Sequence, residues 1–269
     1  MVEFIQQHIP SGVPLEAKVN KVREILQLLT LKILQDKRCF EHIAFVGGTA
    51  LRVLYNLRRF SEDLDFSVIN KDNYDFSSII TTLKHEFTLY GLEVAAKTKV
   101  TKTVQSSMLK FPRLLNDLNL SNHKEQRLSI KVEVDSNLPS GWEIENTLVN
   151  KVYLLNITHF KISSLYSTKI HACFFRRYVK GRDFYDFLWY LSRKEKPNYL
   201  LLNNAIAQTE SKNYGLSESN IKDFLLERAA KIDFNAIRKD VERFLEDKGE
   251  LNFLNIATVS KCIEDAFGV

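Results

Sequence analysis

Residues 43–68 of the chain read IAFVGGTALRVLYNLRRFSEDLDFSV, and this stretch indicates the fold. The four apolar residues 43–46 predict a short buried strand. Two adjacent glycines and a threonine break the run at 47–49, and the apolar spacing over 50–57 is typical of a helix. Polar and apolar residues then alternate over 61–68, which predicts a second strand. The order is therefore strand, glycine turn, helix and strand.

The glycine turn has the features of a phosphate site. Gly47 and Gly48 have no Cβ that would keep a phosphate away from the main chain, and the first free N–H groups of the next helix point toward it. Thr49 adds a hydroxyl that can cap the helix or hydrogen-bond a phosphate oxygen. An ordinary strand-to-helix turn is the alternative when such a tripeptide stands alone.

Two aspartates follow at a spacing typical of one strand face. Asp63 and Asp65 are two residues apart in an alternating segment, so both carboxylates project from the same side. Such a pair of like charges favours a hard cation such as Mg²⁺. A solvent-facing edge strand is the alternative. The short helix between the glycines and Asp63 can return the carboxylates beside the turn, which would place metal and triphosphate in one pocket.

The rest of the chain has an α/β first part and a helical second part. Apolar periodicity predicts helices over 15–36 and 74–90 and strands over 92–104 and 128–134. From residue 162 onward the pattern is helical. Further helices are predicted over 163–178, 183–192, 199–209, 221–231, 235–247 and 256–267. We therefore expect a mixed domain over residues 1–160 and a helical domain over 161–269.

Composition narrows the class of protein. The chain has 269 residues, of which 45% are hydrophobic, enough for a substantial core. It contains no apolar run long enough to cross a bilayer, and residues 1–14 lack the basic and apolar regions of a signal peptide. Its three cysteines form no disulfide or zinc pattern. We expect a cytoplasmic protein without a membrane span, in which oxygen atoms hold any metal.

Two segments are strongly basic. Residues 97–131 hold eight Lys or Arg against two acidic residues, and residues 161–182 hold six against none. This segregation favours a surface that faces a polyanion, whereas two solvated basic faces are the alternative. The basic residues of the first segment are Lys97, Lys99, Lys102, Lys110, Arg113, Lys124, Arg127 and Lys131.

Two pieces of the opening stretch carry a family resemblance. Residues 46–52 (VGGTALR) and 59–66 (RFSEDLDF) resemble the signature of polymerase-β-type nucleotidyltransferases, and in this wording that of the AbiEii/AbiGii group of type IV toxin–antitoxin toxins. The resemblance implies a minimal nucleotidyltransferase fold, a small mixed sheet flanked by helices, with a helical C-terminal lobe that completes the active site. It also implies a nucleoside triphosphate substrate, Mg²⁺ with Mn²⁺ as the alternative, and a cognate antitoxin encoded nearby.

The superfamily has a third carboxylate on a neighbouring strand. Over residues 128–135 the apolar side chains share one face, and Lys131, Glu133 and Asp135 share the other. Glu133 lies in the middle of this strand and is our candidate, with Asp135 second. An exposed face of mixed charge is the alternative.

A second motif of the family matches the basic segment 161–182 and the residues after it. In this motif a helix lysine precedes Arg-Asp-x-Tyr-Asp, and the lysine and the last aspartate contribute to the active site. The resemblance carries these roles to Lys169 and Asp186, with Arg182 and Asp183 matching the surrounding motif. A structural salt bridge is the alternative for a lone Lys–Asp pair.

These observations lead to one functional interpretation. We expect a Mg²⁺-dependent nucleotidyltransferase toxin that transfers a nucleoside monophosphate to RNA, at the tRNA 3′ end, and so stops growth. Transfer to a protein side chain is the alternative, and a catalytically lapsed nucleotide-binding module is a third reading. The expected catalytic residues are Asp63, Asp65, Glu133, Lys169 and Asp186, the first three also holding metal. The expected nucleotide-binding residues are Gly47, Gly48, Thr49, Arg59, Ser61 and Arg182.

Overall fold

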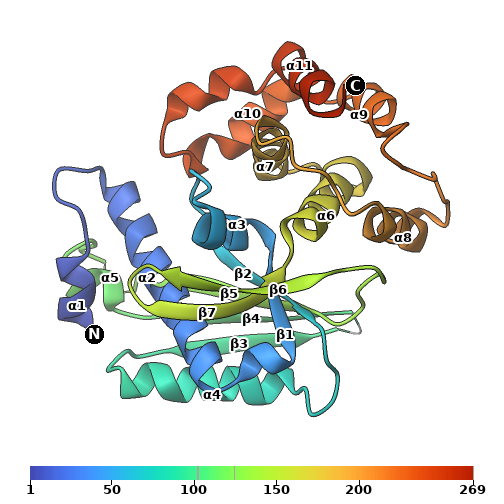
Figure 1. The fold of residues 1–269 in the computed structure, drawn as a ribbon. Coiled ribbons are helices and arrows are strands. Elements are labelled where there is room, and N and C mark those ends of the chain that lie inside the picture. The colour runs from blue at the N-terminus through green and yellow to red at the C-terminus, as the bar shows by residue number, and fades with distance from the viewer. Residues whose placement is uncertain (102, 124, 269) are drawn as a thin grey trace. The chain divides into compact units, whose positions relative to one another are not determined.

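The computed structural model describes residues 1–101, 103–123 and 125–268 and divides the chain into two units (Figure 1). Unit 1 comprises Met1–Ala50, Ser61–Asn137 and Asn146–His159, and unit 2 comprises Leu51–Phe60, Leu138–Glu145 and Phe160–Val269. Two short segments before residue 160 thus belong to unit 2, and the division into domains over residues 1–160 and 161–269 stays a prediction. Lys102 and Lys124 of the first basic segment lie outside the described residues.

Unit 1 is built on a mixed sheet. Within the described residues it has seven strands in the order β3-β4-β5-β2-β1-β7-β6. The central strand β2 runs antiparallel to β1 and parallel to β5. The strands are β1 (Ile43–Val46), β2 (Asp63–Val68), β3 (Ala95–Val100), β4 (Val104–Phe111), β5 (Leu128–Asp135), β6 (Ile144–Asn150) and β7 (Leu154–Phe160). A mixed sheet flanked by helices confirms the expected nucleotidyltransferase fold class.

One face of the sheet is apolar. Leu64 and Phe66 of β2 and Ile130 and Val132 of β5 are buried, because alternate residues of a strand point to the same side. Helix α2 contacts β5, and α4 contacts both α2 and the outer strands (Figure 1). The polar residues of β2 and β5 therefore project from the opposite face. Unit 1 contains α1 (Val2–Gln7), α2 (Leu15–Asp36), η1 (Cys39–Glu41), the start of α3 (Gly47–Tyr55), α4 (Phe76–Leu89) and α5 (Leu114–Asp117).

Unit 2 is helical. Its central helix α7 packs against α6, α10 and α11, and the rings of Phe184, Phe187 and Tyr190 are fully buried there. The segment 51–60 joins this unit through the Phe60 N–H, which donates to the Phe244 carbonyl at 2.7 Å. The helices are α6 (Ile162–Phe175), α7 (Gly181–Ser192), α8 (Tyr199–Glu210), α9 (Ile221–Ala229), α10 (Phe234–Val241), η2 (Glu242–Phe244), η3 (Lys248–Phe253) and α11 (Ile256–Phe267).

The predicted strand over residues 92–104 is wrong in extent. Strand β3 ends at Val100, and the chain returns as β4 from Val104, so that the two form an antiparallel hairpin. Strands β6 and β7 were not predicted. Much of β3 and β6 is exposed, so these outer strands lack the clean apolar alternation of a half-buried strand. Among the described helices, none is both long and apolar enough to span a bilayer.

Candidate active site

The glycine turn and the second aspartate occupy the same place in unit 1. Strand β1 ends at Val46, whose register partner on β2 is Asp65. Gly47 follows with φ of 79°, a conformation that residues with a Cβ rarely adopt. A Cβ on Gly47 would lie 3.0 Å from the Asp65 Cβ and closer still to its Oδ2 atom. The Asp65 carboxylate therefore lies directly against the main chain of the turn.

The three candidate carboxylates share one face of the sheet. Asp65 pairs in register with Glu133 on the parallel strand β5, and Asp63 pairs with Lys131. All four side chains alternate with buried apolar residues and are partly exposed. The Lys131 Nζ atom lies 2.7 Å from the Glu133 Oε2 atom, so Glu133 forms an ion pair along its own strand. The second candidate, Asp135, is in register with Ser67, two residue pairs farther along.

The donor set suits a hard cation that is shared with a substrate. Among the described residues, no three His, Cys, Asp or Glu side chains are grouped so that they could hold a metal by themselves. Mg²⁺ is usually bound through one or two carboxylates together with substrate phosphates and water. Asp63 and Asp65 beside a turn without Cβ atoms fit this mode of binding, which needs no complete protein cage.

Thr49 and Ser61 hold the beginning of β2. The Thr49 side chain is fully buried, and its hydroxyl contacts the Asp63 carbonyl and the Ser61 Oγ atom, the latter at 2.8 Å. The Ser61 carbonyl accepts from the Gln27 Nε2 atom at 3.0 Å. Sequence analysis missed Gln27, although a glutamine within the apolar run of α2 was a usable signal. The Thr49 hydroxyl is thus used inside the protein, and its predicted role toward phosphate stays a prediction.

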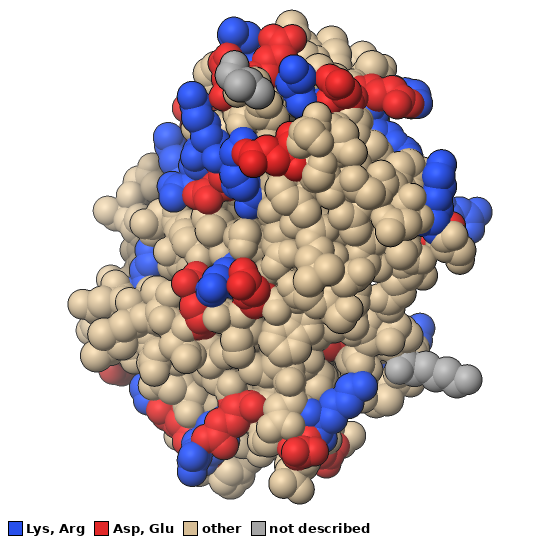
Figure 2. Space-filling view, turned by 45° about the vertical axis from the view of Figure 1, so that its right-hand side comes forward, with Lys and Arg blue, Asp and Glu red and all other residues tan. Residues whose placement is uncertain are grey.

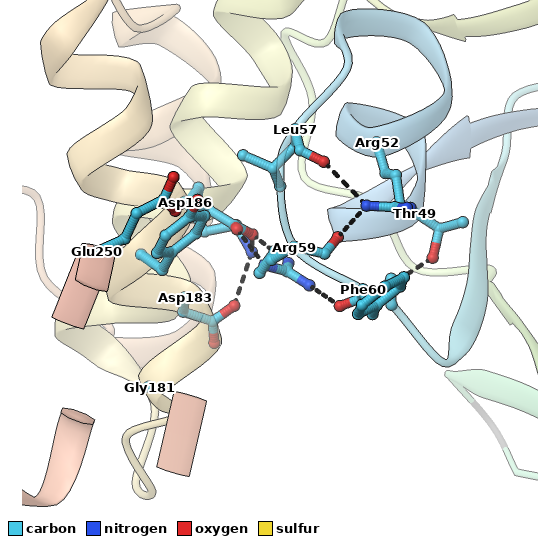
Figure 3. Close-up of polar contacts among 12 residues, drawn as sticks. Thr49, Arg52, Leu57, Arg59, Phe60, Gly181, Asp183, Asp186 and Glu250 are labelled. Carbon is cyan, nitrogen blue, oxygen red and sulfur yellow. Dashed lines mark hydrogen bonds and ion pairs between the residues drawn. The ribbon is translucent and has the colours of Figure 1, made fainter. Parts of the chain in front are cut away.

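Unit 2 contains a series of alternating charges that is buried except at its last member, Arg176. The Arg59 guanidinium, 2% exposed, donates to both carboxylate oxygens of Asp186 at 2.6 and 2.7 Å (Figure 3). The Lys169 Nζ atom lies 2.8 Å from Asp186 and 2.7 Å from Asp183. Asp183 also pairs with Arg176 at 3.0 Å. We call the series Arg59, Asp186, Lys169, Asp183 and Arg176 the charge ladder.

The ladder stabilises the charged forms of Lys169 and Asp183. Burial alone lowers the pKa of Lys169, but the negative charges of Asp183 and Asp186 outweigh it and raise this pKa above the ordinary lysine value. Burial also raises the pKa of Asp183, yet Lys169 and Arg176 more than compensate and bring it to about 2. Lys169 is therefore a protonated side chain held between two carboxylates at neutral pH.

Two further arginines fix the segment 51–60. Arg52 donates to the carbonyls of Leu57 and Arg59 at 3.3 and 3.0 Å and pairs with Glu246 at 2.8 Å (Figure 3). Sequence analysis gave Arg52 no role, although it lies within the motif VGGTALR. Arg182, a predicted nucleotide ligand, places its guanidinium 4.3 Å from the centre of the Phe244 ring. The predicted roles of Arg59 and Arg182 toward nucleotide stay predictions.

The family of the chain follows from a match over most of its length. The family described as "Nucleotidyl transferase AbiEii toxin, Type IV TA system" matches residues 30–263. The chain belongs to this AbiEii family. The AbiEii resemblance of the two sequence motifs is thereby confirmed, and so is the enzyme class, nucleotidyltransferase. The type IV toxin–antitoxin label of the AbiEii family implies a cognate antitoxin.

Solved structures show the same fold as this AbiEii chain. JHP933 from Helicobacter pylori is 21% identical with a TM-score of 0.56, and the match covers 91% of this chain and 90% of that one. A candidate nucleotidyltransferase from H. pylori is 20% identical with a TM-score of 0.57, and the match covers 91% and 93% of the two chains. A search of curated proteins finds no match.

The charged side chains of the AbiEii chain are distributed in small groups on the face that Figure 2 shows. Blue and red side chains stand next to one another there, with uncharged areas between the groups. The Lys and Arg side chains visible on this face lie in several separate groups.

Proposed function

We propose that the protein transfers a nucleoside monophosphate from a nucleoside triphosphate to the 3′ end of an RNA, tRNA being the expected acceptor, in a Mg²⁺-dependent reaction. The contact between the Asp65 carboxylate and the Gly47 main chain is the observation that supports this most strongly. It brings a cation ligand and a phosphate-binding turn to one point, as transfer from a metal-bound triphosphate requires. The cytoplasm supplies both substrates and is the proposed compartment.

Each group of unit 1 has a defined task in this proposal. Gly47 and Gly48 would admit the phosphates to the main chain, and the carboxylates of Asp63 and Asp65 would hold Mg²⁺. The bound ion would neutralise charge on the phosphate oxygens during displacement of pyrophosphate. Thr49 would position Asp63 without contacting the substrate itself, because its hydroxyl hydrogen-bonds the Asp63 carbonyl and the Ser61 Oγ atom. In-line attack of a 3′ hydroxyl on the α-phosphorus needs mainly such positioning.

The roles of three other residues are proposed on the family resemblance. Glu133 would ligate a second metal or help to deprotonate the attacking hydroxyl, for which its ion pair with Lys131 would have to open. Lys169 would neutralise charge on the phosphates, and Asp186 would orient that lysine, with which it is paired at 2.8 Å. Both ladder residues are buried, which fits a positioning role at least as well as direct contact with substrate.

The acceptor is the least constrained part of the proposal. The two basic segments favour RNA, because cations that neutralise phosphates supply most of the sequence-independent affinity for a nucleic acid. Transfer to a protein side chain remains the second candidate. A lapsed module is disfavoured, since the chain carries Asp63 and Asp65 on one face of the same strand and a pure binding module has no need of two like charges so close together.

A labelling experiment tests the proposal directly. The protein is incubated with each of the four α-labelled nucleoside triphosphates, Mg²⁺ and either total tRNA or a cell lysate. We expect label in RNA with one preferred nucleotide, and none when Mg²⁺ is chelated. Label in protein instead of RNA would establish the second candidate, and absence of label in both would refute the transferase proposal.

A further inference from the structure

The loop between α6 and α7 presents an unusual combination of side chains. It consists of Arg176, Arg177, Tyr178, Val179 and Lys180, all of which are exposed. The Tyr178 side chain is 72% exposed and that of Val179 46%. A tyrosine ring left in water in this way contributes little to folding, since burial of the ring is what stabilises a core.

The charges of this loop are only partly compensated. Arg176 donates to Asp183 at 3.0 Å, which ties the first residue of the loop to the charge ladder. Within the described part of the chain, Arg177 and Lys180 form no ion pair, and the Arg177 guanidinium lies 5.3 Å from the centre of the Tyr178 ring. At the start of α7, the Asp183 carboxylate is engaged by Arg176 and Lys169, and the Asp240 carboxylate accepts from the Gly181 N–H.

An exposed ring flanked by free cations matches the chemistry of an unpaired nucleotide. A base stacks on an aromatic face whatever its identity, and the phosphates on either side pair with Lys or Arg. We propose that residues 176–180 bind the single-stranded end of the RNA acceptor, with Tyr178 stacking on a base and Arg177 and Lys180 contacting phosphates. This inference rests on the proposed function only in taking RNA as the ligand.

The composition of the loop favours RNA over a protein partner. The core of a protein interface is depleted of charged residues, whereas three of the five residues of this loop are basic and surround Tyr178 and Val179. Base-paired RNA also fits poorly, because its bases are already stacked and leave no free face for the ring. The loop therefore predicts a preference for single-stranded over duplex RNA.

Direct RNA binding tests the loop apart from catalysis. The probes are an end-labelled single-stranded RNA of about 12 nucleotides, within the usual size of such sites, and a blunt duplex of the same length. Fluorescence anisotropy without nucleoside triphosphate gives Kd over a series of salt concentrations. We expect Tyr178→Ala to weaken single-strand binding about 5- to 150-fold and Tyr178→Phe to bind like wild type. The double change Arg177→Gln and Lys180→Gln should lower the log–log salt slope by about 1.4.

Matched variants separate this loop from general charge and ring effects. Phe253→Ala removes another exposed ring of unit 2, and Lys194→Gln with Lys239→Gln removes two exposed cations with the same change in net charge. Both controls should leave single-strand binding within about twofold of wild type. The inference would be overturned if Tyr178→Ala bound single-stranded RNA as tightly as wild type, or if it weakened duplex and single-strand binding by the same factor. Loop variants that kept RNA binding but lost binding to a protein would also overturn it. Labelling of protein would refute the RNA acceptor without altering these Kd values.

Discussion

The carboxylate of Asp65 occupies the space that a side chain on Gly47 would need. The glycine is therefore required for two reasons, its positive φ of 79° and the close approach of the aspartate. Gly47 directly follows strand β1, whose last residue Val46 is the register partner of Asp65 on the antiparallel strand β2. The phosphate turn and the cation ligand thus depend on each other's geometry.

Gly47→Ala is expected to lower the turnover of the transferase reaction by a factor of at least about 100. The new methyl group would collide with the Asp65 carboxylate and displace it from its position. The strained φ alone should cost about 1 kcal/mol of folding stability. Turnover with the preferred nucleotide and the urea midpoint measure the two effects separately.

Gly91→Ala is the matched control for that change. Gly91 has nearly the same φ, 76°, but a Cβ there would meet no atom within 4 Å. The Gly91→Ala variant should therefore lose a similar amount of folding stability and keep its transferase activity. Equal activity losses in the two variants would show that backbone strain, and not the contact with Asp65, matters.

Asp63→Asn and Asp65→Asn are each expected to remove label transfer and growth arrest while the protein stays folded. The amide keeps the size of the side chain but is a much weaker ligand for Mg²⁺. Circular dichroism checks the fold, and the labelling assay checks activity. Asp135→Asn, on the same face but nearer the strand end, should retain activity. Full toxicity of an expressed Asp65→Asn protein would refute the assignment of the active site.

Lys169→Ala is expected to reduce turnover by at least about 100-fold, or about 2.7 kcal/mol of transition-state stabilisation. The fold should survive, because Asp186 keeps Arg59 and Asp183 keeps Arg176 as partners. Lys161→Ala is the control, since Lys161 is half-exposed and pairs with Glu143 at 3.6 Å. Similar losses of turnover in both variants would show that Lys169 contributes only as one of many basic residues and has no specific role in the active site.

Arg59→Lys is expected to destabilise the protein by about 3 kcal/mol, because a lysine cannot reproduce the two parallel hydrogen bonds to the buried Asp186. Arg58→Lys should cost less than about 0.5 kcal/mol, since Arg58 is exposed and pairs with Glu250 only at 3.5 Å. Urea unfolding of both variants measures the difference. Equal midpoints would show that the buried pair adds nothing to stability.

The low pKa of Asp183 predicts a loss of stability in acid. Folding lowers this pKa from 3.8 to about 2, so ionised Asp183 stabilises the native state above about pH 4. That contribution, about 2 kcal/mol, is lost as the pH falls from about 4 toward 2. Asp183→Asn should be less stable than wild type at pH 6, and the gap should narrow through this window. A gap that stays constant with pH would contradict the charge ladder.

Local patterns in the sequence determined much of the fold and part of the site. The order of strand, glycine turn, helix and strand follows from apolar periodicity around Gly47, and the shared face of Asp63 and Asp65 follows from the alternation of a strand. The helix bounds of α2 and α11 agree with the apolar spacing alone. These features are predictable because each depends on residues only a few positions apart.

The tertiary structure decided which segments meet. No periodicity indicates that β5 pairs in parallel with β2, and this pairing is what sets Glu133 opposite Asp65. The same holds for Arg59, a predicted nucleotide-binding residue, which is buried against Asp186, 127 positions away in the chain. Contacts of this kind form only when the whole chain packs and distant surfaces bury each other away from water. They are therefore determined by residues far apart in the sequence and not by local propensity.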